Sequence, residues 1–301
     1  MAVTMADITK LRKMSGAGMM DCKKALTESD GDIEKAMEII RKKGQAVAAK
    51  RSDREASEGC VLAKTTGDFA VIIALKCETD FVAQNADFVK LTQDILDLAV
   101  ANKCKTLDEV KALPMGNGTV QDAVTDRSGI TGEKMELDGY NVVEGAYTSI
   151  YNHQGNNQLC TIVAMNKEAE AAAHGVAMQI AAMSPAYLDE ASVPAEVVEH
   201  EKTILAAQMK EDPKMASKPE AVLAKIAAGK MGKYYKENCL VDQEFVRSDL
   251  FQGDVKGYVA SVAKELGTEI KLNGFIRMMK GDGLEKREEN FAEEIAKQIN
   301  G

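Results

Sequence analysis

The sequence predicts an α+β protein built from several units, and three observations indicate this class. Apolar side chains recur at helical spacing through the first 54 residues. The period changes to two near residue 58, as is typical of strands, and a pattern of strands followed by a helix occurs twice, over about 58–101 and 134–183. Finally, a chain of 301 residues is long for a single hydrophobic core, so we expect two or three domains.

The N-terminal residues 1–54 are predicted to form a compact module of three helices. Thr4 can cap the first helix, which a glycine-containing turn at residues 15–18 ends. The second helix begins at Met19, and the third opens at Asp32 with apolar side chains at positions i, i+3, i+4 and i+7. Short helices joined by tight glycine turns favour an independently packed head.

The third helix is expected to end at Gly44. Lys42 and Lys43 place positive charge where the helix dipole favours it, and glycine suits the left-handed position that follows a helix. Residues 45–54 are then predicted to form a polar helical linker between the head and the rest of the chain.

The middle of the chain is predicted to hold sheets covered by helices. Residues 60–64 and 69–76 flank a turn at 65–68, which indicates a β-hairpin. A helix over about 87–101 follows it. Further elements expected here are short helices over 102–130, strands within 134–165 with a turn at 153–157, and a helix over 169–183.

Residues 194–237 read as two charged helices separated by prolines at Asp212-Pro213 and Lys218-Pro219. This pattern predicts an antiparallel helical hairpin that projects from the body. It could be a dimerisation arm, a partner-contact arm or a solvated insertion. The remaining elements expected are a helix over 255–266, a strand over 269–279 and a last helix over 286–299.

These elements predict four parts along the chain. They are a helical head over 1–54, a core N-subdomain over 55–140, a core C-subdomain over 141–280 with the helical hairpin inserted at about 190–238, and a C-terminal helical module over 281–301.

Charge is distributed unevenly between the head and the body. Residues 1–54 hold 12 basic and 8 acidic side chains, a net charge of +4, whereas residues 55–301 hold 26 basic and 39 acidic ones, a net charge of −13. The total of −9 argues against a general nucleic-acid binder, which needs a basic surface for phosphate contacts. For the head, the alternatives are docking onto an acidic partner surface or an ordinary solvated face.

Several other classes are disfavoured. No apolar run reaches the roughly 18–20 residues of a membrane span, and the N-terminus resembles neither a signal peptide nor a transit peptide. The six cysteines are scattered and form no Cys-x-x-Cys pair, which indicates reduced, mostly buried thiols of a cytoplasmic protein.

No constellation for catalysis, metal binding or cofactor binding is apparent. His153, His174 and His200 lack metal-ligand spacing, and residues 16–18 follow a helix rather than the strand that a phosphate-binding loop requires. We therefore expect a binding protein, with no catalytic residue, no metal and no cofactor of its own.

Residues 76–82 (KCETDFV) stand where a buried strand should turn into a helix. In one alternative, Thr79 or Asp80 caps that helix and Phe81 is its first buried residue. In the other, Phe81 is an exposed wedge that inserts into a partner. On the residues alone, the capped helix entry is favoured.

Five collinear stretches closely resemble the bacterial elongation factor Ts family. The two family signatures match residues 11–26 (LRKMSGAGMMDCKKAL) and 77–83 (CETDFVA). The resemblance continues through 176–185 (VAMQIAAMSP), 240–246 (LVDQEFV), and 274–277 (GFIR) with 281–286 (GDGLEK).

This family is the guanine nucleotide exchange factor of the translational GTPase elongation factor Tu. The resemblance implies a ubiquitin-associated-like three-helix head, a two-subdomain core with antiparallel sheets packed on helices, an inserted coiled-coil hairpin and a C-terminal helix. It implies elongation factor Tu, in its GDP-bound and nucleotide-free forms, as the partner, and leaves open a homodimer in a 2:2 complex. GDP and Mg²⁺ would belong to the partner, and no nucleic acid or membrane is implied.

The resemblance also implies contact residues. In the family, the Asp-Phe pair at Asp80 and Phe81 inserts near the Mg²⁺ site and promotes GDP release. The implied wedge is Thr79, Asp80, Phe81 and Val82. The implied contacts of the head are Arg12, Met19, Met20 and Lys23, and those of the C-subdomain and C-terminus are Gln179, Met183, Gly274 and Phe275. The alternative hypothesis is a ubiquitin-associated-like scaffold or chaperone cofactor without exchange activity.

Overall fold

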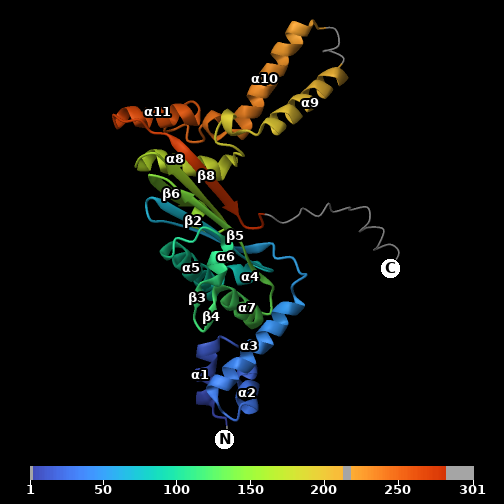
Figure 1. Cartoon of the computed structure of the whole chain (residues 1–301), viewed down its shortest axis with the longest axis vertical. Helices are drawn as coiled ribbons and strands as arrows, with labels where there is room; N and C mark the ends of the chain where they lie inside the picture. The colour runs from blue at the N-terminus through green and yellow to red at the C-terminus, as the bar shows by residue number, and fades with distance from the viewer. Residues whose placement is uncertain (1–2, 213–217, 283–301) are drawn as a thin grey trace, which may run out of the picture.

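The computed structural model describes residues 3–212 and 218–282, and it combines helices with antiparallel sheets. This confirms the predicted α+β class. In Figure 1 a helical head lies at one end, two sheets with their helices lie in the middle, and a helical hairpin lies at the other end. The strand over 269–279 is present but shorter, whereas the last helix expected over 286–299 lies outside the described residues.

The head consists of α1 (Met5–Ser15), α2 (Met19–Glu28) and α3 (Ile33–Lys50). Thr4 caps α1 through a reciprocal pair of bonds with Asp7, and Gly16 ends it in the left-handed conformation. These predicted boundaries are confirmed. Its small core contains Ile8, Leu11, Ala17, Cys22, Ala25, Leu26 and Ala36.

The predicted end of the third helix at Gly44 is wrong, because α3 continues without a break to Lys50. Gly44 is buried where α3 crosses α7 (Val120–Thr131), directly opposite Gly129. A Cβ built on Gly129 would lie 2.1 Å from the Gly44 Cα. The glycine therefore serves the close approach of two helices, a requirement that no local pattern distinguishes from helix termination.

The first sheet has the order β1-β2-β5 and is antiparallel throughout. The predicted hairpin is confirmed as β1 (Glu58–Thr65) and β2 (Phe69–Cys77). The third strand, β5 (Met135–Glu144), pairs with β2 along its whole length. All nine residues of β2 are buried, because both faces of this central strand are covered.

Helices cover the outer face of the first sheet. Phe88, Ile95 and Leu96 of α5 pack against Val71, Ile73 and Leu75 of β2 in the largest core. The elements on this side are α4 (Asp80–Ala83), α5 (Ala86–Ala101), α6 (Leu107–Ala112), the short strands β3 (Pro114–Met115) and β4 (Gly118–Thr119), and α7.

The second sheet has the order β6-β7-β8, from β6 (Tyr147–Asn152), β7 (Leu159–Met165) and β8 (Leu272–Met279). Its outer face packs against α8 (Glu170–Met183), beside which lies α11 (Val255–Glu265). Three single turns of 3-10 helix connect these elements, over His153–Gly155, Glu190–Ser192 and Leu240–Asp242.

The two sheets pack face to face. Val61, Ile72 and Ala74 of the first sheet meet Cys160, Ile162 and Met278 of the second in a separate core cluster. The middle of the molecule is thus four layers thick, helices, sheet, sheet and helices, as Figure 1 allows the reader to follow. This stacking explains why every residue of β2 and β7 is buried, with no alternation of buried and exposed side chains along either strand.

The boundary predicted between residues 140 and 141 falls inside β5. Because residues 135–144 all belong to one strand of the first sheet, that boundary would divide a continuous ladder. We propose to place it after Glu144, where the chain leaves the first sheet for the second.

The predicted helical hairpin is present as α9 (Ala195–Glu211) and α10 (Glu220–Asn238). These helices lie side by side in Figure 1 and extend away from the sheets. Ile204 of α9 and Val222 of α10 are partly exposed apolar side chains. Among the helices of the described residues, none combines the length and the apolar character needed to cross a lipid bilayer.

Candidate functional site

The segment that follows β2 forms a single exposed turn of helix, α4, at Asp80–Ala83. Thr79 caps it, since its Oγ1 accepts a hydrogen bond from the Val82 amide at 3.4 Å. Phe81 is 86% exposed, the largest value among the exposed large hydrophobic side chains of the described residues. The favoured alternative from the residues was therefore right about the cap and wrong about Phe81, which is not buried.

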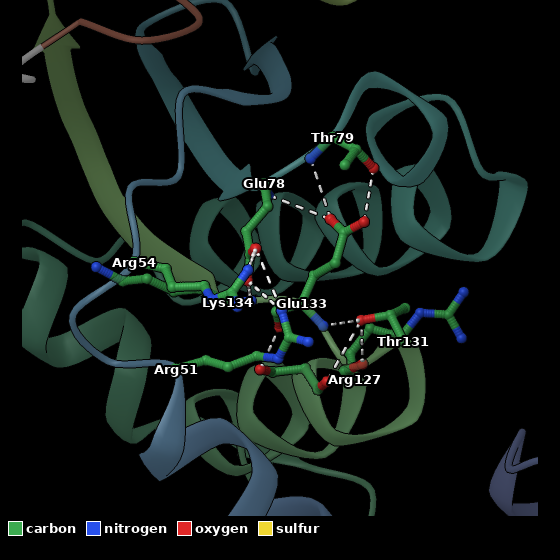
Figure 2. Close-up of polar contacts among 9 residues, drawn as sticks. Arg51, Arg54, Glu78, Thr79, Arg127, Thr131, Glu133 and Lys134 are labelled. Atoms are coloured by element: carbon green, nitrogen blue, oxygen red, sulfur yellow. Dashed lines mark hydrogen bonds and ion pairs between the residues drawn. The ribbon is translucent and has the colours of Figure 1, made fainter. Parts of the chain in front are cut away.

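The Glu133 carboxylate holds the start of this turn. Its Oε2 accepts hydrogen bonds from the Glu78 amide at 3.2 Å and the Thr79 amide at 3.1 Å. Its Oε1 accepts a third from the Thr79 hydroxyl at 2.6 Å. Figure 2 shows the Glu133 side chain reaching across to Thr79.

Glu133 is itself held by the end of α7. Gly132 ends that helix in the left-handed conformation, with φ of 73°. The Glu133 amide donates to the Thr131 hydroxyl at 3.3 Å, and its carbonyl accepts a bond from the hydroxyl of buried Ser128 at 2.5 Å. Both backbone groups of Glu133 are thus satisfied by α7, and this directs its side chain toward the turn (Figure 2).

The Glu78 carboxylate points the opposite way, toward the end of the head's last helix. It accepts hydrogen bonds from Arg51 at 3.0 and 3.2 Å, from Arg54 at 3.2 Å and from the Lys134 amide at 2.6 Å (Figure 2). Burial alone would raise the pKa of Glu78, but these hydrogen bonds and the nearby guanidinium charge together lower it. Glu78 therefore ties the linker to the base of the turn.

Arg127 of α7 braces the other end of the turn. Its Nη2 donates to the Asn85 side chain at 2.9 Å and lies 3.2 Å from the Asp87 carboxylate. Asn85 is the N-cap of α5. Arg127 of α7 and Glu133, which follows that helix, therefore contact the chain on the two sides of α4.

No sequence pattern predicted that Glu78, Glu133, Arg51 and Arg54 belong to this site. Glu78 lies within the stretch 77–83 that resembles the family, and its place in that stretch was the only signal that could have identified it. Glu133 and the arginines come from elements 24 to 55 residues away along the chain. No local pattern could have brought them together.

The implied contacts of the head are all on its surface. Met19 is 45% and Met20 63% exposed, and Arg12 and Lys23 are also exposed. Between the head and the core lies a cavity of about 1140 Å³. Residues lining it include Met14, Ile39, Lys43, Leu91 and Met115.

The expectation that Gln179 contacts a partner needs correction, because this side chain is fully buried in α8. Its amide nitrogen donates to the Gln243 side chain and the Glu244 carbonyl, both at 3.1 Å, and its oxygen accepts from the Val246 amide at 2.8 Å. Gln179 thus holds the segment that precedes α11.

The other implied contacts of the C-subdomain are accessible to different degrees. Met183, the last residue of α8, is 47% exposed. Gly274 and Phe275 lie on β8, where Phe275 is half-buried against the core of the second sheet. In Figure 1 the head, α4 and the second sheet are spread along the molecule, so the implied contacts do not converge on one pocket.

The described residues hold no cluster suited to a metal ion, and their thiols are buried. Within 3–212 and 218–282, no group of three or more His, Cys, Asp or Glu side chains could hold a metal ion. All six cysteines are free and buried. Burial raises the pKa of Cys60 to about 11 and, with nearby acidic charge, that of Cys77 to about 12, so neither is a ready nucleophile.

Comparison with known proteins places the chain in a family. Residues 78–282 match the family model described as Elongation factor TS. Proteins named Elongation factor Ts are 61% identical in Phocaeicola vulgatus, 59% in Parabacteroides distasonis and 58% in Bacteroides thetaiotaomicron. Each alignment covers 92% of this chain and 98% of the relative.

The matched region begins at Glu78, the residue before the turn cap, and ends at Asp282 after β8. It includes the exposed turn, β5 and the whole second sheet, whereas β1 and β2 precede it. The relatives cover nearly the whole chain at well over half identity, which extends the similarity to the head. The chain belongs to the elongation factor Ts family of translation elongation factors.

Proposed function

We propose that this protein is a guanine nucleotide exchange factor, which binds GDP-loaded elongation factor Tu and promotes GDP release. The observation that carries the proposal is Phe81, 86% exposed on a turn that hydrogen bonds hold in place. An exposed Phe forgoes about 1.5–3 kcal/mol that its burial would contribute. A partner that buries Phe81 recovers this free energy.

Exchange requires a difference in affinity. A partner protein loosens GDP only when it binds the GDP-free form more tightly than the GDP-bound form, and GDP must then weaken the protein complex by the same factor. Phe81 provides such a difference if the gap it fills exists only in the rearranged GTPase. Asp80 adds an exposed carboxylate that can accept hydrogen bonds from a displaced segment.

The rest of the surface supplies binding affinity. We propose that Arg12, Met19, Met20 and Lys23 form one contact of the head, and that Met183, Gly274 and Phe275 form a second contact on the C-subdomain. No covalent bond changes in this reaction. The protein therefore acts without a catalytic group, and both Mg²⁺ and GDP belong to the partner.

The test is the release of fluorescent GDP from the cognate elongation factor Tu, measured by stopped flow at saturating concentrations of this protein. Phe81→Ala is expected to slow release about thirtyfold or more, since truncating a central aromatic anchor costs about 2 kcal/mol or more. Asp80→Ala is expected to slow it less. Leu266→Ala, which removes another exposed apolar side chain at the end of α11, is the matched control.

Two results would contradict the proposal. If the wild-type protein leaves GDP bound, it is a scaffold or chaperone cofactor and not an exchange factor. If Phe81→Ala and Asp80→Ala both release GDP as fast as the wild type, exchange occurs without this turn.

A further inference from the structure

We infer that Glu133 is a positioning residue for exchange, one that sets the direction of Phe81 without touching the partner. This inference rests on the proposed function. Its basis is that one carboxylate accepts three hydrogen bonds at the start of the turn, from the amides of Glu78 and Thr79 and from the Thr79 hydroxyl.

The hydroxyl bond sets the cap. A threonine hydroxyl has one proton, and the 2.6 Å contact shows where that proton points, toward Glu133. The lone pairs of Oγ1 are then left to accept from the Val82 amide, which closes the cap of α4. Glu133 thus orients the Thr79 hydroxyl, which is hydrogen-bonded directly to the helix that carries Phe81.

The turn has little stability of its own. It contains four residues, Asp80–Ala83, and one turn of helix does not repay its nucleation cost in water. Phe81 contributes no packing here, because it is exposed. The direction of its side chain therefore depends on what fixes the two ends of the turn, and Glu133 fixes the first.

The role of Glu133 is hydrogen bonding and not charge pairing. It forms no ion pair with any residue in the part of the chain that the structure describes, and its donors are two amides and a hydroxyl. A glutamine can keep the two amide bonds through its carbonyl oxygen. Its NH₂ group would face the Thr79 hydroxyl and compete with the cap.

A fixed turn matters because ordering it during binding would reduce the free energy available to displace GDP. Loss of the brace is expected to lower the maximal rate of release, while the contacts of the head and the second sheet continue to supply affinity. The maximal rate and the half-saturating concentration should therefore respond differently.

The experiment measures both quantities for Glu133→Ala, Glu133→Gln and Phe81→Ala. We expect Glu133→Ala to lower the maximal rate of GDP release about tenfold, with a half-saturating concentration within about threefold of wild type. Glu133→Gln is expected to recover part of the loss. Circular dichroism and thermal melting establish that each variant is folded.

Glu109→Gln is the matched control. Its carboxylate also accepts two backbone amides, those of Lys105 and Thr106, but at the start of α6. It is expected to leave the maximal rate unchanged. A loss of the same size in this control would show that helix capping in general, and not the brace of the turn, limits the rate.

A double variant separates positioning from general destabilisation. If Glu133 acts through Phe81, then Glu133→Ala with Phe81→Ala should be no slower than Phe81→Ala alone. Additive losses would overturn the inference, as would wild-type rates for a folded Glu133→Ala. A normal rate for Phe81→Ala beside a slow Glu133→Ala would likewise overturn it, because Glu133 would then not act through Phe81. A wild-type protein that leaves GDP bound would instead contradict the proposed function, so the two failures are distinguishable.

Discussion

Single residues decide how the exposed turn is presented. The chain leaves Phe81 in water while Glu78, three positions earlier, is largely covered and bonded to Arg51 and Arg54. One short segment therefore combines an exposed apolar side chain, that of Phe81, with a carboxylate, that of Glu78, which accepts hydrogen bonds from three residues. This is the arrangement expected of a surface prepared for a partner, since the cost of ordering it is met within the free protein.

Glu78 should make folding stability depend on pH. Its pKa is lowered in the folded state, so it stabilises the protein above the ordinary glutamate pKa of about 4.3, and that contribution is lost as pH falls through the lowered value. Glu78→Gln is expected to reduce the free energy of unfolding by about 1–3 kcal/mol at pH 7. The difference from wild type should shrink as the pH is lowered from 5 toward 3.

Urea unfolding at a series of pH values measures this difference. Glu269→Gln is the control, because the exposed ion pair of Glu269 with Lys271 is expected to change stability by less than about 0.5 kcal/mol. A Glu78→Gln difference that stays constant down to pH 3 would show that its bonds do not depend on the carboxylate charge.

At the scale of elements, the crossing of α3 and α7 links the head to the core. Gly44 and Gly129 allow the two backbones to touch, and Arg41 lies 3.2 Å from Asp122 and 3.5 Å from Asp126 across the same crossing. Because α7 also carries Arg127 and is followed by Glu133, this helix and the residue after its cap together contact the head, the cap of α5 and the base of the exposed turn.

Gly129→Ala is expected to destabilise the protein by about 1–3 kcal/mol, because its Cβ would overlap the Gly44 backbone and force the helices apart. The free energy of unfolding in urea measures this. Gly229→Ala is the control, since nothing lies within 4 Å of a Cβ there and alanine should stabilise the interior of α10 by about 0.5–1 kcal/mol. Equal effects at both sites would contradict a tight crossing.

At the scale of the whole molecule, the basic surface lies on the head and the exposed turn lies on the acidic body. The head carries the net charge of +4, and Arg12, Lys13, Lys23 and Lys24 form no ion pair within the described ranges of the chain. The four-layered body carries the acidic excess and the exposed turn. An unpaired basic surface of this kind accelerates association with an acidic partner surface.

Association with elongation factor Tu should therefore slow as salt is added. We expect Lys23→Gln with Lys24→Gln to lower the association rate at low salt and to flatten its dependence on ionic strength. Stopped-flow measurements between about 0.05 and 0.5 M salt give the association rate as a function of ionic strength. At the upper end of this range the Debye length is only a few ångströms. Lys264→Gln is the control, because the Lys264 side chain is exposed on α11, far along the chain from the head. An association rate that is indifferent to salt would exclude electrostatic docking by the head.

The sequence by itself determined the local elements and the family. Capping residues such as Thr4, the hairpin around residues 65–68 and the helix that ends near Ala101 all follow from interactions within a few positions of the chain. The motif at 77–83 indicated the segment that we propose to act on the partner. These features depend on hydrogen-bonding preferences and periodicity, which a linear pattern records.

Only the tertiary structure decided how those elements meet. In it, β5 pairs with the first sheet and the two sheets pack face to face. The helix α3 continues beyond Gly44, and the Gln179 side chain is buried. The tertiary structure also places Glu133 against a turn 54 residues earlier. Such contacts join positions far apart in the chain, and their free energy comes from burial and close approach in three dimensions, so no local pattern contains them.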